Sequence, residues 1–178
     1  MNPEEVARLW RDAFGETQPG HDMAWQLRFH SLPHAKQYPD SPDEYAELLR
    51  RHNEVASAVL GEGGECLLLV GLWPPTDLAV EANRLPERAD LEFVEVSGLP
   101  TSVDEENGTR FMAAAVRWCS GCFDDVIRDV ADERLPVVVF ANLARASAYK
   151  PYDGGGDVIC ASAEDLAELS QRFGAWLP

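Results

Sequence analysis

Apolar residues recur at the spacing of an amphipathic helix in four segments of the chain. The first begins at Asn2-Pro3, a capping residue followed by proline at the first helical position, and it ends at Gly15. The longest begins at the capping box that opens with Ser41 and ends at Gly61. The other two run over residues 121–134 and from Ser162 to the C-terminus. The pattern therefore predicts four helices.

Shorter segments between these helices have the patterns of β-strands, either alternating apolar and polar positions or continuous apolar runs. They are residues 25–31, 66–73, 91–96, 111–118, 136–141, 147–149 and 158–161. We expect the third and fourth to pair across the Asn107-Gly108 loop, and the last two to pair across a glycine-rich turn. The sequence predicts an α+β fold of mixed α/β character in a single domain over residues 1–178. In it, helices flank a mixed or mostly antiparallel sheet of about six strands.

The chain is strongly acidic, with a formal net charge of −16 and an isoelectric point near 4.5. This charge disfavours binding to nucleic acids and to anionic membrane surfaces, because both attract Lys and Arg. It suits a basic protein partner, since opposite fields accelerate encounter. The alternative is that the charge serves solubility alone. The segment from Arg28 to His52 is neutral, so the acidity lies elsewhere, for example in the loop acids Asp104, Glu105 and Glu106.

No apolar run approaches the ~20 residues of a membrane span, and the acidic, helical start differs from a signal peptide. We therefore expect a cytoplasmic protein whose four cysteines are free thiols. Cys119 and Cys122 in WCSGC have the spacing of a thioredoxin-type dithiol. However, no later proline suits the cis-proline of that fold, and the acids that follow would disfavour a thiolate. The pair also lacks a second cysteine pair for zinc. Two small residues at a tight turn is the simpler interpretation.

The segment RFHSLPHAKQYP and the helix after it hold the first candidate chemistry. Arg28 and His30 share the polar face of a strand, and His52 falls on the apolar stripe of the helix, where histidine is costly without a partner. One interpretation is structural: His52 finds a partner in the core and Arg28 pairs with a carboxylate. The other is a pocket for an anion, with His52 as general acid or base. A His30–His34 metal pair would need a helix, which Pro33 argues against.

The segment AYKPYDGGGDVICAS holds the second candidate chemistry. Its three glycines permit backbone conformations closed to other residues and leave amides exposed. The segment lacks the spacing of a Walker or Rossmann loop, and Asp153 and Asp157 would repel a phosphate unless a metal ion intervened. A hairpin turn is the plain interpretation, and a contribution of Asp153 to a pocket is the alternative.

The stretches RFHSLP and KQYP, the helix ELLRRHN and the hairpin YDGGGDVI resemble an uncharacterised family of small bacterial proteins. The resemblance covers both ends of the chain well and residues 73–117 poorly, and it implies no established activity. The chain departs from the family pattern at His34 and Cys119, which weakens a metal or redox interpretation. The resemblance implies a shared set of polar residues, which are the candidate binding residues: Arg28, His30, Ser31, Tyr38, Arg51, His52, Asn53, Tyr152, Asp153 and Asp157.

Two functional hypotheses remain open. The first is a cytoplasmic binding protein of the immunity or antitoxin type, in which a compact acidic domain neutralises a basic partner. The second is a small-ligand-binding protein or enzyme that uses a pocket of Arg28, His30, His52 and Asp153. No residue is assigned a catalytic role, no metal or cofactor is expected, and the oligomeric state stays open. A pocket uniting the four side chains would favour the second hypothesis, whereas buried motifs beside an acidic face would favour the first.

Both hypotheses make one geometric prediction. Buried polar groups need one another, so the two motif segments should meet in space. We expect Arg28 or His52 within hydrogen-bonding reach of one of the hairpin residues Tyr152, Asp153 and Asp157.

Overall fold

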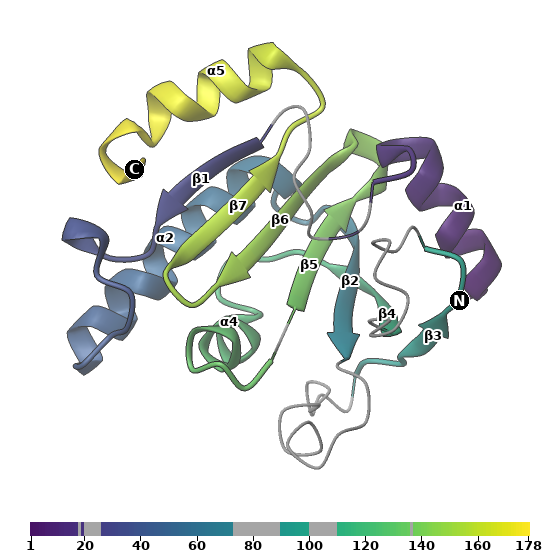
Figure 1. Cartoon of the computed structure of the whole chain (residues 1–178), viewed down its shortest axis with the longest axis horizontal. Coiled ribbons are helices and arrows are strands. Elements are labelled where there is room, and N and C mark those ends of the chain that lie inside the picture. The colour runs from purple at the N-terminus through teal and green to yellow at the C-terminus, as the bar shows by residue number, and fades with distance from the viewer. Residues whose placement is uncertain (18, 20–25, 73–89, 100–109, 136) are drawn as a thin grey trace.

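The computed structural model describes residues 1–17, 19, 26–72, 90–99, 110–135 and 137–178, and these contain one seven-stranded sheet (Figure 1). The strands lie in the order β1-β7-β6-β5-β2-β4-β3, and every neighbouring pair is antiparallel. The predicted α+β class is confirmed, but the sheet has seven strands where six were expected. The strands are β1 (Gln26–His30), β2 (Glu65–Leu72), β3 (Val94–Val96), β4 (Arg110–Arg117), β5 (Val137–Asn142), β6 (Ser147–Tyr152) and β7 (Gly155–Ile159).

The two predicted strand pairs are present in the sheet. Val94 lies opposite Ala113 in the β3–β4 pair, and Tyr152 lies opposite Gly155 in the β6–β7 hairpin. The Asn107-Gly108 loop and the acids at 104–106 lie outside the described residues, as do Trp25 and Trp73.

The four described α-helices are α1 (Pro3–Phe14), α2 (Pro42–Leu60), α4 (Asp124–Ala131) and α5 (Ala163–Arg172). Three of them, α1, α2 and α5, begin where the capping sequences predict. The side chains of Asn2, Ser41 and Ser162 each accept a hydrogen bond from a backbone N–H of the first turn, at 3.0, 3.3 and 3.1 Å. Helix α4 is shorter than the predicted 121–134, because residues 121–123 form a turn before it.

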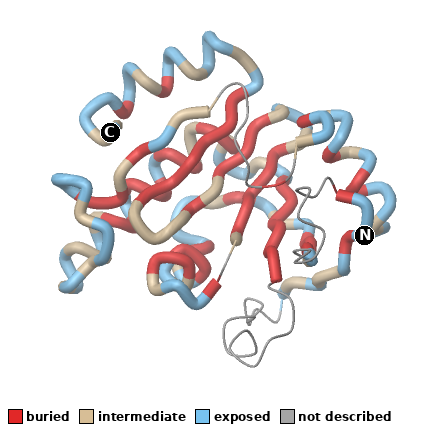
Figure 2. Tube along the Cα trace, in the orientation of Figure 1, coloured by how far each residue is buried: buried red, intermediate tan, exposed pale blue. Residues whose placement is uncertain are grey.

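Alternating sheet residues pack into two separate cores, one on each face. Helices α2 and α4 cover one face, where they meet Leu68, Val138 and Phe140. Helix α1 packs on the other face against Leu69 and Val139, and α5 lies beside β1 at the sheet edge (Figure 1). The central strands are buried along most of their length, while the helices keep one face in solvent (Figure 2). This period-two division decides which motif residues can meet.

Candidate functional site

The two motif segments are neighbours, because β1 pairs with β7 at the edge of the sheet. Arg28 lies opposite Asp157, and its Nε and Nη2 donate to the two carboxylate oxygens at 2.9 and 3.3 Å. The Asp157 side chain is only 6% exposed, so the guanidinium neutralises a buried charge. The guanidinium also lies over the Tyr152 ring, 5.5 Å from its centroid. The prediction that the segments meet is therefore confirmed.

Close packing of β7 against β1 accounts for two of the three hairpin glycines. A Cβ atom on Gly155 would lie 2.0 Å from the Phe29 carbonyl oxygen, and one on Gly156 would lie 2.7 Å from the Phe29 ring. Gly154 has more space, since its nearest neighbour would be Gln37 Cγ at 3.4 Å. Close backbone approach to β1 therefore explains the second and third glycines.

His52 belongs to a buried hydrogen-bonded chain that joins α2 to Ser31, just after β1, and to Tyr149 within β6. Its Nε2 lies 2.8 Å from Ser31 Oγ, and its Nδ1 is hydrogen-bonded to the Tyr149 hydroxyl. His52 is 1% exposed, and Ser31 and Tyr149 are fully buried. Burial lowers the pKa of His52 to about 3, so the ring is neutral at physiological pH. The histidine on the apolar stripe has found its partners, as the structural interpretation requires.

The pocket of Arg28, His30, His52 and Asp153 is not assembled. Arg28 and Phe29 are adjacent in β1 and therefore point to opposite faces, and His52 packs edge-on to Phe29 with ring centroids 5.6 Å apart. Asp157, rather than Asp153, is the carboxylate that pairs with Arg28. Asp153 instead accepts a hydrogen bond from Gln37, and its Oδ2 lies 3.2 Å from the Tyr38 hydroxyl. Strand alternation thus corrects the pocket hypothesis.

Arg51 and Asn53 also hold parts of the fold together. Arg51 donates to Glu47 Oε1 at 2.6 Å and to the His30 carbonyl at 3.1 Å, and it lies over the Trp176 ring near the C-terminus. Asn53 accepts from the Gly121 amide at 2.7 Å and donates to an Asp124 carboxylate oxygen.

His30 lies at a small hollow near the C-terminus. The hollow has a volume of about 260 Å³ and also includes Arg51 and Trp176 in its lining. Among the described residues, that lining includes neither His52 nor Asp153. His34 stands in a 3₁₀ turn with φ of 60°, so it and His30 do not share a helical face. No described group of three or more His, Cys, Asp and Glu side chains is arranged to hold a metal ion.

Acidic side chains from two segments of the chain, Glu133 and Asp153, converge on Tyr38. Its hydroxyl donates to Glu133 Oε1 at 2.9 Å and lies 3.2 Å from Asp153 Oδ2. The hydrogen bond to Glu133, together with partial loss of water and the bond to Asp153, raises the pKa of Tyr38 to about 12. Tyr38 is nevertheless 43% exposed.

We call this surface the acidic corner, and it continues across the N-terminus of α2 to α4. Tyr45 donates to Asp132 at 2.6 Å, and Arg134 pairs with Asp129 and Asp132 at 2.9 Å each. A groove of about 570 Å³ lies there. The acids of the corner are Asp40, Glu44, Asp124, Asp125, Asp129, Asp132, Glu133 and Asp153, and its basic side chains are Lys36, Arg128 and Arg134.

Comparison with known proteins gives one family. A family model described as "Domain of unknown function (DUF3885)" matches residues 10–178. The chain belongs to this family. The resemblance to an uncharacterised family is thereby confirmed at the level of the family. No curated protein and no solved structure matches the chain. In the described part of this DUF3885 chain, no helix combines the length and apolar character that crossing a bilayer requires.

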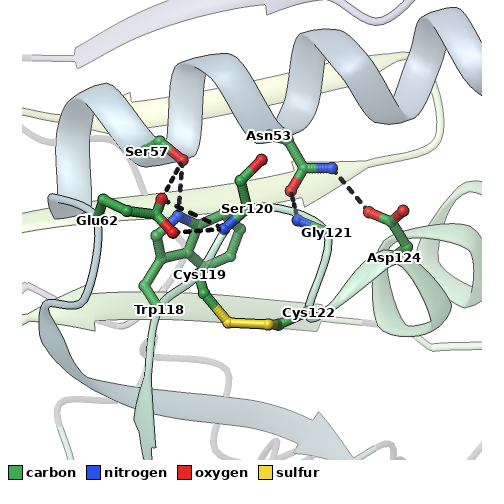
Figure 3. The surroundings of a disulfide bond; sticks show 9 residues. All are labelled: Asn53, Ser57, Glu62, Trp118, Cys119, Ser120, Gly121, Cys122 and Asp124. Atoms are coloured by element: carbon green, nitrogen blue, oxygen red, sulfur yellow. Dashed lines mark hydrogen bonds between the residues drawn. A yellow bond between two sulfur atoms is a disulfide. The ribbon is translucent and has the colours of Figure 1, made fainter.

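The WCSGC segment of this DUF3885 chain differs from the sequence-based expectation. Cys119 and Cys122 form a disulfide, so they are not free thiols (Figure 3). Cys66 and Cys160 are free and buried. Burial raises the pKa of both free thiols to about 11. The tight turn expected at this pair is present, and the bond closes it.

Three residues with specific roles were not among the candidates: Gln37, Glu133 and Tyr149. A histidine on an apolar stripe already implies a buried polar partner, so His52 was a signal for a residue such as Tyr149. No sequence signal places Glu133 beside Tyr38, because that contact depends on how α4 packs against α2.

Proposed function

We propose that this protein is a cytoplasmic binding protein of the immunity or antitoxin type, whose acidic corner receives a basic surface of a partner protein. The observation that supports it most is the exposed Tyr38, held between Glu133 and Asp153. The motif side chains Ser31, His52 and Asp157 are buried within the fold and cannot contact a partner, whereas the motif residue Tyr38 is exposed at this corner.

The chemistry of the corner suits a partner rich in Lys and Arg. A tyrosine supplies apolar area and a polar tip with few rotatable bonds, and tyrosines are enriched among residues that dominate binding energy. Its hydrogen bonds fix the ring before contact, so little side-chain freedom remains to be lost on binding. The net charge of −16 would add long-range attraction to a cationic surface.

The proposal is tested by affinity capture from the native host at low and high salt. The test variant is Glu133→Gln with Asp153→Asn, which removes two charges from the corner. The matched control is Glu164→Gln with Glu168→Gln, which removes two exposed charges from α5. Wild type and control should retain one basic protein in stoichiometric amount at low salt. The corner variant should bind it about tenfold more weakly, because it loses both steering and direct contacts.

High salt should weaken capture by the wild type, since exposed charges more than about 8 Å apart are screened at physiological ionic strength. Tyr38→Ala should weaken capture at both salt concentrations, because its packing contribution is not screened. If no stoichiometric basic protein is recovered at either salt, or if the control variant loses as much binding as the corner variant, the proposal is wrong.

A further inference from the structure

The disulfide lies in the turn that joins β4 to α4, and its two sulfur-bearing residues differ in exposure. Cys122 is exposed, whereas Cys119 is half-buried. Buried aromatic residues flank them on both sides, and the rings of Trp118 and Phe123 stack with centroids 5.6 Å apart. An incoming reagent therefore reaches Cys122 more readily than Cys119.

Hydrogen bonds that do not involve sulfur hold this turn on the end of α2 (Figure 3). Asn53 Oδ1 accepts from the Gly121 amide at 2.7 Å, and the Glu62 carboxylate accepts from the Ser120 amide at 3.1 Å. Behind the turn, the buried Trp118 indole donates to Ser57 Oγ at 3.0 Å. Because none of these contacts involves sulfur, opening the disulfide does not remove a partner from any of them, and we expect the two cysteines to stay within bonding reach.

The backbone of the turn also keeps the two cysteines close together. The Cys122 amide donates to the Cys119 carbonyl at 3.1 Å, and the two Cα atoms are 5.4 Å apart, inside the range for a disulfide. The cysteines are separated by three positions. A disulfide stabilises mainly by restricting the unfolded chain, and this effect grows with the length of the closed loop, so a loop this short gains little from it. The disulfide therefore contributes little to the stability of the fold.

The geometry points to a reversible dithiol–disulfide site at Cys119 and Cys122 that exchanges with a dithiol donor, and Cys122 is the sulfur that the donor attacks. A donor thiolate bonds to Cys122 Sγ while the Cys119–Cys122 bond breaks, and Cys119 leaves as a thiolate and takes up a proton. The second donor thiolate then attacks the donor sulfur of the mixed disulfide and releases Cys122, which is also protonated. The donor is oxidised to its disulfide, and the site gains two electrons and two protons.

The surroundings favour a donor without extra negative charge. Glu62 contacts the turn, and Asp124 and Asp125 follow it directly, so an anionic reagent is repelled. This selects a neutral dithiol or a protein dithiol with few acids nearby over glutathione, whose carboxylates add charge.

The test uses the folded, oxidised wild type in buffers that poise reduced against oxidised dithiothreitol, a neutral dithiol. Free thiols are trapped with a maleimide and counted by intact mass spectrometry. Two thiols beyond those of Cys66 and Cys160 should appear as the buffer becomes reducing and disappear when it becomes oxidising, with an unchanged circular dichroism spectrum. Cys66→Ser with Cys160→Ser is the control, and it should give the same curve. A bond that opens only in denaturant would overturn the proposal.

The attacked sulfur is identified with single-thiol variants and an aromatic disulfide reagent. Cys122 in Cys119→Ser should react at least about tenfold faster than Cys119 in Cys122→Ser, because only the first is exposed. If either variant fails to fold, brief treatment of the wild type with a limiting monothiol, followed by peptide mapping, locates the mixed disulfide. Its position on Cys122 would support the proposal, and equal or greater labelling of Cys119 would contradict it.

Discussion

Acid should destabilise this protein through His52, and replacing that residue with Gln isolates the effect. In the folded chain, burial lowers the pKa of His52 to about 3. In the unfolded chain, histidine titrates at about 6.5. As the pH falls below about 6.5, His52 therefore becomes protonated in the unfolded state while it stays neutral in the folded state. The contribution of neutral His52 to the free energy of unfolding is therefore complete above about pH 6.5, and it is lost as the pH falls toward the pKa of His52 in the folded chain.

The magnitude follows from the distance between pH and the unfolded pKa. At pH 5 that distance is about 1.5 units, and each unit is worth about 1.4 kcal/mol. His52 should therefore cost the wild type about 2 kcal/mol of unfolding free energy between pH 7 and pH 5. His52→Gln should also lose about 1–3 kcal/mol at pH 7, because Ser31 or Tyr149 is left without its buried partner.

The assay is urea unfolding of wild type and variant at several pH values from 5 to 8. The difference between the two free energies should shrink by about 2 kcal/mol from pH 7 to pH 5. His34→Gln is the control, and it should follow the wild type, because His34 is exposed. Parallel curves for wild type and His52→Gln would refute the reasoning, since they would mean that the folded state accepts the proton as easily as the unfolded one.

Two further predictions concern the contact between β1 and β7. Gly155→Ala should lower the free energy of unfolding by at least about 2 kcal/mol, because the added Cβ would meet the Phe29 carbonyl. Gly154→Ala should change it by no more than about 0.5 kcal/mol, because that site has more space. Thermal melts of both variants test this, and equal effects would contradict the packing account. Arg28→Met should lower the free energy of unfolding by about 1 kcal/mol, because it leaves the buried Asp157 carboxylate without its partner. This value is at the low end for such a loss, because the Arg28 side chain is 56% exposed and water screens the pair. A double-mutant cycle with Asp157→Asn measures the pair, and additive effects would show that the bond contributes nothing.

Local patterns were sufficient for most elements of this fold. Asn2, Ser41 and Ser162 marked the helix starts because capping involves only residues two or three positions apart. The alternation in β1 placed Arg28 and Phe29 on opposite faces. The strand order could not be read in this way, because antiparallel partners are chosen by packing of the whole sheet. That order is what places β7 between β1 and β6.

The candidate site was predictable in part for the same reason. His52 on an apolar stripe implied a buried partner, but its identity depended on which strand α2 crosses. The pocket hypothesis ignored that Arg28 and His52 lie on different sides of β1. The disulfide was missed because the expected cytoplasmic location was taken to mean that all four cysteines are free thiols. Bond formation requires only a turn that brings the two sulfur atoms together.

The central claim is that the acidic corner binds a basic protein, and photo-crosslinking in the native host tests it most directly. Tyr38 is replaced by p-benzoylphenylalanine in one variant, and the exposed Ala167 of α5 is replaced in the control. After irradiation, position 38 should give one discrete adduct containing a basic protein, and position 167 should not. The adduct should weaken when Glu133→Gln and Asp153→Asn are added. No adduct from position 38, or the same adduct from both positions, would contradict the claim.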